Sequence, residues 1–491
     1  MKYSYKILKN YIEGSLNIDE LIEYLKILGL NPKIIKKEND DFIFEIETPA
    51  NRPDLLSFIG LLREVMPLAN FSIKKPIDEF LQETISEYIP VEIENIDDCF
   101  YYSCRIIKGI NNILSPDEFK KIIENIGFRS SFYVVDISNY VMCEIGQPLH
   151  IFDLDKIEGK IIVRKGRKKE KIVTIDGKER DIEDILIIAD EKKPIAIAGI
   201  MGGANTEVTH STKNILIESA FFNPVVVRKG GKKLGLVTEA SLRFEKGLNV
   251  SLAKEGMRRA SFMIKKMCGG ELGKISFKGI ETEKKKTIYI KVENVKKILG
   301  IDVERDFVNF LFKKLNFKIE EKDGDFSVTI PEYRKDIMEE IDLIEEIAKY
   351  VKYSEIKEEI PFSNIKPSFS STPFETYKMI KDILVNLGFQ EILTLSFISE
   401  SIVKKFNINA VKIENPLSGQ FSFLRDSLLY NILEVIKYNI YHQNENIQAF
   451  ELGKIYKKKG EKYNEEESLL IISLNAGTFF NFKGKIEKFF E

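Results

Sequence analysis

Two residues of this chain have side chains and surroundings that could do chemistry on a bound ligand. His150 follows Gly146-Gln147-Pro148-Leu149, a turn bounded by glycine and proline that would present the imidazole to a ligand. Glu218 has apolar residues on both sides, and a carboxylate in such a segment is costly to bury without a partner. Each has an ordinary alternative, a hydrogen-bonded loop histidine or a paired core acid. The local sequence alone favours those alternatives.

Four acidic residues gather at the start of one predicted helix: Asp336, Asp342, Glu345 and Glu346. Positions 342, 345 and 346 are three and four apart, so they share a helical face. Oxygen-only ligands of this kind suit Mg²⁺. Acids at a helix N-terminus also favour the helix dipole, and Arg334 offers them a partner. The spacing does not choose between the metal site and the helix cap.

Paired glycines end a predicted strand that runs from Ala198 to Gly203, where a ligand could approach the backbone closely. The segment lacks the G-x-G-x-x-G spacing and the following helix of a dinucleotide site, and it is not a Walker A loop. A tight turn is the ordinary alternative. Basic runs at 164–171 and 228–233 carry no interleaved aromatic residues of the kind that stack on bases.

The bulk composition limits the class of protein. With 44% hydrophobic and 31% charged residues, the chain has a globular balance, and 491 residues suggest three or four domains. Its net charge of −2, from 74 basic and 76 acidic side chains, lacks the basic surplus usual in proteins that bind phosphate backbones. The four cysteines fit neither a zinc site nor a disulfide framework, and we find no signal peptide or membrane span. These features predict a cytoplasmic protein with reduced thiols.

Spacing and turn signals predict the elements that must position these residues. Asn17 with Glu20 forms a capping box, and Gly29 ends the helix that follows. Asp176-Gly177 predicts a hairpin, and Asn316 predicts a left-handed helix end. The other predictions are strands at 32–37, 41–47, 185–189 and 194–201, helices at 55–66, 252–267, 303–315, 339–350 and 374–387, a proline-rich linker at 361–373, and a helix from 483 onward. No internal repeat is evident.

Several long motifs, taken together and in order, resemble phenylalanyl-tRNA synthetase beta subunits of the bacterial type along essentially the whole chain. The motifs are Asn51-Arg52-Pro53-Asp54, Val134 to Val141, Gly146 to His150, Ala198 to Gly203, Glu218 to Pro224, Thr238-Glu239-Ala240-Ser241 with Arg243-Phe244-Glu245, Tyr333 to Ile337, Asp342 to Glu346, Asn415 to Ser418, and Phe450 to Gly453. Their number and order make the resemblance specific.

The resemblance implies an α+β multidomain protein. Its modules would be an N-terminal α/β module at 1–87, an α+β editing module at 88–280, a winged-helix-like module at 285–360, and a class II synthetase-like antiparallel core at 374–491 that is catalytically inactive and incomplete. Two departures from the family stand out. The oligonucleotide-binding barrel usual before the Asn51 motif is missing, and the chain stops at Glu491, before the usual ferredoxin-like anticodon-binding domain. We therefore expect a fragment, a split subunit or a reduced one.

The resemblance also implies an α₂β₂ ligase. Its alpha subunit would use ATP and Mg²⁺ to charge phenylalanine tRNA, and this chain would hydrolyse mischarged tyrosyl-tRNA; neither DNA nor a membrane is an expected partner. The residues carried over are Ser138, His150 and Thr238 as catalytic groups, Gly202, Glu218 and Ala240 as the editing pocket, and Asp336, Asp342, Glu345 and Glu346 as Mg²⁺ ligands near the alpha subunit. Two alternatives stay open. The chain could be a structural partner of the alpha subunit with decayed editing, or a free-standing tRNA deacylase, against which the core-like segment argues.

Overall fold

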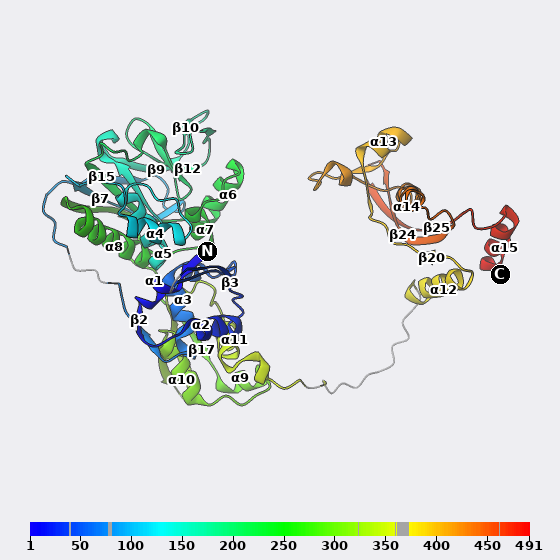
Figure 1. Ribbon diagram of the computed structural model, residues 1–491, viewed down its shortest axis with the longest axis horizontal. Coiled ribbons are helices and arrows are strands. Elements are labelled where there is room, and N and C mark those ends of the chain that lie inside the picture. Colours follow the sequence, from blue (N-terminus) through cyan, green and yellow to red (C-terminus); the bar gives the residue numbers. More distant parts are fainter. Residues whose placement is uncertain (39–40, 77–80, 323, 359, 361–372, 461) are drawn as a thin grey trace. The chain divides into compact units, whose positions relative to one another are not determined.

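The computed structural model describes residues 1–38, 41–76, 81–322, 324–358, 360, 373–460 and 462–491. The chain divides into two compact units, Met1–Glu359 and Ile360–Glu491 (Figure 1). Most of the predicted proline-rich linker lies outside the described residues. Within the described ranges, no helix combines the length and the apolar character needed to cross a bilayer.

The first unit opens with a small antiparallel module. Its elements are β1 (Lys2–Ser4), α1 (Tyr5–Lys9), β2 (Ile12–Gly14), α2 (Ile18–Ile27), β3 (Lys33–Glu38), β4 (Asp41–Glu45), a 3₁₀ turn (Pro53–Leu55), α3 (Phe58–Val65) and β5 (Phe71–Ile73). The strands pair in the order β1-β4-β3, and β2 pairs with β5. The capping box predicted at Asn17 and Glu20 is confirmed, and Gly29 follows α2 with a φ of +75°.

The middle of the first unit contains two larger sheets. Its elements are β6 (Val91–Ile93), β7 (Cys99–Lys108), α4 (Asp117–Asn125), α5 (Tyr133–Ile145), β8 (Leu149–Asp153), β9 (Ile161–Lys165), β10 (Lys171–Val173), β11 (Glu179–Asp181), β12 (Leu186–Ala189), β13 (Pro194–Ile197), β14 (Met201–Gly202), β15 (Asn214–Phe222), α6 (Pro224–Leu234), α7 (Glu239–Lys246), α8 (Val250–Cys268) and β16 (Glu271–Gly279). One sheet has the order β16-β7-β15-β8 and the other β14-β13-β12-β9-β6. The hairpin predicted at Gly177 joins β10 to β11.

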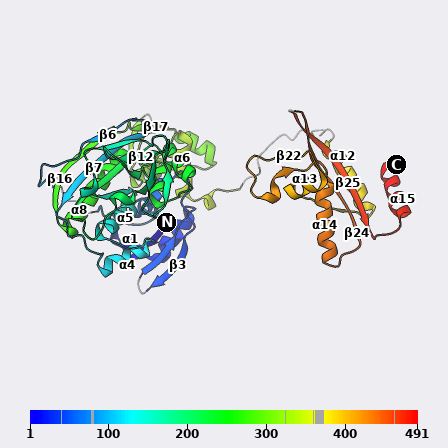
Figure 2. The same cartoon turned by 90° about the horizontal axis from the view of Figure 1, so that it is seen from above.

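The central strand β15 is buried on both faces, because each face packs against a different layer. Ile215 and Ile217 belong to the core under α5 and α8, which lie beside this sheet in both views (Figure 2). Leu216 and Ala220 belong to the core shared with the five-stranded sheet. Side chains alternate along a strand, so Glu218 lies on the same face as Leu216 and Ala220.

The prediction of a single strand at 194–201 is wrong in one respect. The chain folds back on itself there, and β13 pairs with β14 in antiparallel register, with Ala196 opposite Gly202. Gly199 makes the turn with a φ of +66°, where a residue with a side chain is disfavoured. A Cβ at Gly199 would also lie 3.0 Å from the ring of Phe244. The turn brings Gly202 back toward β8 and β15.

A three-stranded module closes the first unit. Its elements are β17 (Lys286–Ile290), α9 (Val292–Leu299), α10 (Arg305–Lys314), β18 (Lys318–Lys322), β19 (Asp325–Ile330) and α11 (Glu340–Val351), with the strand order β17-β19-β18. Asn316 has the predicted left-handed conformation after α10, with a φ of +61°.

The second unit has a smaller core. Its helices are α12 (Pro373–Asn386), α13 (Glu400–Phe406), α14 (Leu429–Tyr441) and α15 (Phe479–Phe490), and its strands are β20 (Gln390–Glu391), β21 (Phe397–Ile398), β22 (Val411–Lys412), β23 (Phe423–Leu424), β24 (Ile447–Lys459) and β25 (Lys462–Leu474). The long β24–β25 pair is antiparallel as expected, but β20 adds to β24 in parallel, so that sheet is mixed. Its main apolar cluster is built around Leu384, Phe389 and Phe450.

Candidate functional site

A narrow cavity of about 60 Å³ lies where the two large sheets meet α7. Four of the residues singled out in the sequence line it: His150, Gly202, Glu218 and Ala240. Glu218 and His150 are directly opposite each other in the β15–β8 ladder, so their side chains share one face of the sheet. The remaining walls are mainly apolar, with Ile188, Ile197, Met201 and Phe244 among them.

Glu218 is a buried acid with one carboxyl oxygen left unpaired among the described residues. Its side chain is 5% exposed, and its Oε2 atom makes no hydrogen bond within the described part of the chain. Burial raises the pKa of Glu218 to about 8, and the neighbouring Tyr102 hydroxyl lowers it only in part. The carboxyl group is therefore mostly protonated at neutral pH, when it can both donate and accept a hydrogen bond.

His150 forms the wall that faces Gly202. Its ring packs edge-on against Phe152, with 4.5 Å between ring centroids. Burial lowers the pKa of His150 to about 4, so the imidazole is neutral at pH 7. A Cβ built at Gly202 would lie 2.6 Å from Nε2 of His150. The absence of a side chain at residue 202 is thus what leaves room for the histidine ring.

The hydroxyls of the other two predicted catalytic residues are engaged with the backbone. Thr238 caps α7, because its Oγ1 accepts the N–H of Ser241 at 3.1 Å and donates to the carbonyl of Ile200 at 2.9 Å. It therefore fixes the loop beside the cavity. The Oγ of Ser138 donates to the Val135 carbonyl of its own helix at 2.7 Å, and Ser138 does not line the cavity.

The four acidic residues predicted as Mg²⁺ ligands do not converge on one point. Asp336 and Glu346 both bind Arg334, which donates to them over 2.6–3.0 Å. Asp342 accepts the N–H groups of Met338 and Glu339 at the start of α11, and Glu345 is exposed. The described residues contain no group of three or more acids, histidines or cysteines placed to hold a metal. This arrangement is the ion-pair and helix-cap alternative, so a shared Mg²⁺ among these four residues is not supported.

The Arg334 arrangement occurs a second time in the first unit. Arg52 binds Asp54, two residues later, and Glu64, twelve residues later, through the same guanidinium atoms and with the same spacing. Lys349 joins the two copies, because its Nζ lies 2.8 Å from Glu64 and 2.7 Å from Glu346. The first unit therefore contains an internal repeat that the sequence analysis missed. The spacing Arg-x-Asp followed by Leu-x-x-Glu, with Leu61 in the first copy and Leu343 in the second, was the signal.

Comparison with known proteins accounts for most of the chain. Family models match residues 98–269 (B3/4 domain), 288–353 (tRNA synthetase B5 domain) and 356–491 (phenylalanyl tRNA synthetase beta chain CLM domain). The phenylalanine–tRNA ligase beta subunit of Protochlamydia amoebophila is 38% identical over 467 residues, which cover 91% of this chain and 57% of that protein. The chain belongs to the phenylalanyl-tRNA synthetase beta-subunit family.

Other members of the beta-subunit family match to a similar extent. The proteins from Carboxydothermus hydrogenoformans and Aquifex aeolicus are 37% and 35% identical, over 88% and 89% of this chain and 55% of each relative. The chain thus spans little more than half the length of these relatives. A crystal structure of an N-terminal fragment of the beta subunit from Pyrococcus horikoshii covers 72% of this chain and 99% of the fragment at 16% identity, with a TM-score of 0.43, too low to establish a shared fold.

Arg243, in the motif that runs from Thr238 to Glu245, is a structural residue to which the sequence analysis gave no role. The side chain is fully buried and donates to the carbonyls of Leu56, at 3.0 and 3.2 Å, and Glu239, at 2.8 Å. It fastens α7, which carries Ala240 and Phe244 into the cavity wall, to the N-terminal module. Its position in Arg243-Phe244-Glu245, just after the Thr238–Ser241 motif, was the only signal in the sequence.

Proposed function

We propose that this chain acts as the beta subunit of a cytoplasmic phenylalanine–tRNA ligase and that the narrow cavity binds the side chain of tyrosine misattached to phenylalanine tRNA. In this proposal an alpha subunit, in an α₂β₂ assembly, charges the tRNA with ATP and Mg²⁺. The relatives' shared name supports the ligase role. The buried Glu218 carboxyl, whose Oε2 atom has no hydrogen-bond partner among the described residues, supports the editing role.

The cavity's chemistry addresses the difference between the two amino acids. Tyrosine differs from phenylalanine by one hydroxyl, and an apolar activation site rejects an added hydroxyl only weakly. A second site that hydrogen-bonds this hydroxyl discriminates far better, because phenylalanine would leave its polar groups unpaired. Neutral Glu218 accepts from or donates to a phenol, and the apolar walls suit the ring. At about 60 Å³ the cavity is narrow for a ring, so unbranched Met201 on its wall would have to move.

The chain's own groups suit hydrolysis by a positioned water. Neutral His150 has ring nitrogens that can orient a water molecule, while the hydroxyls of Ser138 and Thr238 are engaged with the backbone. We therefore expect water to attack the ester carbonyl directly and the tRNA hydroxyl to leave, with no covalent intermediate on the chain.

The test uses the chain assembled with its alpha subunit. Glu218→Ala should lower the rate of tyrosyl-tRNA hydrolysis at least about 100-fold, because a site built on a specific hydrogen bond loses that bond. Phenylalanine charging should stay at the parental rate. Glu271→Ala, an exposed acid at the start of β16, serves as the matched control. If the parent and Glu218→Ala hydrolyse tyrosyl-tRNA at the same rate and with the same selectivity, the pocket assignment is overturned. A parent that supports tRNA charging but does not hydrolyse tyrosyl-tRNA would favour a structural role alone.

A further inference from the structure

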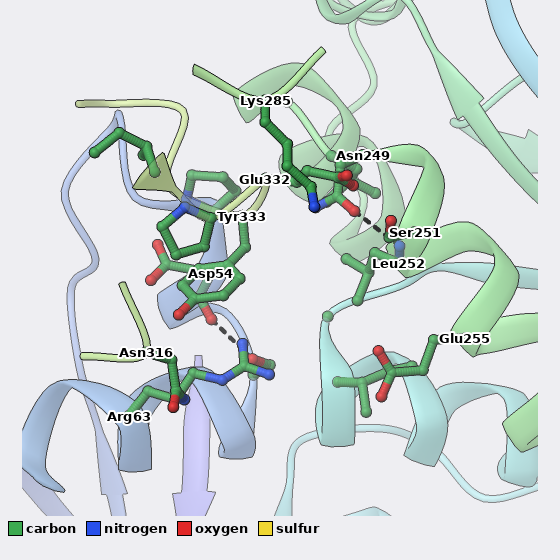
Figure 3. Close-up of a pocket in the computed structure, with 18 of the residues that line it drawn as sticks. Asp54, Arg63, Asn249, Ser251, Leu252, Glu255, Lys285, Asn316, Glu332 and Tyr333 are labelled. Carbon is green, nitrogen blue, oxygen red and sulfur yellow. Dashed lines mark hydrogen bonds between the residues drawn. The ribbon is translucent and has the colours of Figure 1, made fainter. Parts of the chain in front are cut away.

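A second cavity, larger than the first, lies at the junction of the three modules of the first unit. Its volume is about 300 Å³, within the range of small-molecule sites. Asp54 and Arg63 come from the N-terminal module, Asn249 from the start of α8, and Glu332 and Tyr333 from the module that contains α11. Figure 3 shows Asp54, Arg63 and Tyr333 on one side of the space and Asn249, Ser251, Leu252 and Glu255 on the other.

The lining combines an apolar surface with charges of both signs. Ile145, Leu248, Leu252 and Ile330 supply apolar wall, while Arg63, Lys285 and Lys318 are basic and Glu255 and Glu332 are acidic. Asp54 adds little net charge, because Arg52 occupies both of its carboxylate oxygens at 2.8–2.9 Å. A ligand that satisfies such a lining needs an apolar body and opposite charges close together.

Glu332 marks where a cationic group would bind. Its Oε2 atom is buried and has no hydrogen-bond partner in the part of the chain that the structure describes. A buried carboxylate oxygen left unpaired costs free energy that a bound ammonium group would recover. Figure 3 places Lys285 at the same end of the cavity, but no hydrogen bond joins it to Oε2.

Arg63 marks where an anionic group would bind. Its guanidinium stacks on the Tyr333 ring, with 4.5 Å between Cζ and the ring centroid. Stacking fixes the plane of the guanidinium and leaves its edge for a carboxylate, which it can bind through two hydrogen bonds. The first turn of α8, capped by Asn249, adds a favourable dipole on the opposite wall.

We propose that this junction cavity binds a free α-amino acid with an apolar side chain, its ammonium on Glu332, its carboxylate on Arg63 and its side chain against the apolar wall. The site is separate from the narrow cavity at Glu218, and the proposal does not depend on the editing function. A ligand held by all three modules would also stabilise their junction.

The test is calorimetric titration of the full chain, without an alpha subunit, by L-phenylalanine and L-leucine. Both should bind, and Glu332→Gln should weaken the binding of each at least about tenfold, which corresponds to about 1.4 kcal/mol. N-acetyl-L-phenylalanine, which lacks the ammonium, should bind the parent at least about tenfold more weakly than L-phenylalanine. Glu345→Gln, an exposed acid on α11, and Glu218→Ala should both bind like the parent.

Three outcomes would overturn the proposal. They are no binding of either amino acid at millimolar concentration, equal binding of the N-acetylated compound, and binding lost in Glu218→Ala but kept in Glu332→Gln. The comparison of ligands on the parent chain stays decisive even if the Glu332 variant fails to fold.

Discussion

The buried acids around Lys349 and the buried acid of the narrow cavity have opposite surroundings. Glu64 and Glu346 each bind one arginine and share Lys349. Glu218 is buried to a similar degree, yet its Oε2 has no hydrogen-bond partner among the described residues. Burial alone would raise the pKa of Glu64, but the charges of Arg52 and Lys349 hold that pKa well below its usual range. With no cation beside it, burial instead raises the pKa of Glu218 to about 8.

The difference separates two uses of a buried carboxyl group. An acid whose oxygens are all bound holds modules together, because removing it leaves buried cations without a partner. An acid with an unpaired oxygen beside a cavity contributes no more to packing than an amide of the same shape would. The free-energy cost of burying that oxygen is explained if a ligand binds to it. Replacing the acid by an amide should therefore change the free energy of unfolding, and its pH dependence, in opposite directions at the two places.

The largest effect is expected at the shared network. Glu64→Gln should lower the free energy of unfolding of the first unit by about 3–5 kcal/mol at pH 7, since Arg52 and Lys349 then face a neutral group. The pKa of Glu64 is depressed in the folded chain, so its contribution is present above the ordinary carboxyl pKa and is lost as pH falls through the lower folded pKa. Urea unfolding at pH 7 measures the loss of stability, and urea unfolding at lower pH measures how the contribution of Glu64 falls. Glu345→Gln should change stability by less than about 0.5 kcal/mol, and an equal loss in that control would remove the distinction.

The opposite sign is expected at the cavity. The pKa of Glu218 is raised to about 8, so its contribution to stability is fully present below about pH 4.5 and is lost as pH rises through 8. Glu218→Gln, which never ionises, should therefore be more stable than the parent by about 4 kcal/mol at pH 8 and should differ little below pH 5. Thermal unfolding across this pH range measures the gap. A gap that did not widen with pH would show that Glu218 ionises normally.

The smallest effect is expected at the two helix caps of the repeat. Ser57 accepts the N–H of Gly60 at 3.0 Å at the start of α3, and Asp342 caps α11 in the second copy. Ser57→Ala and Asp342→Ala should each cost about 1 kcal/mol. Added Mg²⁺ should leave both losses unchanged in a thermal melt. Stabilisation by Mg²⁺ in the parent that disappears only in Asp342→Ala would restore the metal prediction.

Local sequence predicted local structure well, for identifiable reasons. Three local features depend on residues within a few positions of one another: the capping box at Asn17 and Glu20, the left-handed Asn316 and the hairpin at Gly177. The turn at Gly199 was missed, because a run of apolar residues around one glycine also fits a continuous strand. That error concealed how Gly202 approaches His150.

The family motifs predicted which residues form the candidate site, and the structure shows what their side chains contact. Four of the six residues predicted for the editing site line one cavity, while the Ser138 and Thr238 hydroxyls bind backbone carbonyls. Which atom a hydroxyl contacts depends on the backbone around it, and spacing along the chain does not specify that.

The sequence by itself determined the helices, their caps, the family and the residue types at the cavity, because these depend on neighbours along the chain or on long motifs. Only the tertiary structure decided which buried charges are paired. Glu346 meets Lys349 one helical turn away, but Glu64 reaches the same lysine across 285 positions. Glu218 has no hydrogen-bond partner for Oε2 in the described part of the chain, although its strand neighbours are as well packed. A carboxylate's energy is set by the charges and dipoles that surround it in space, and folding brings those together from distant parts of the chain.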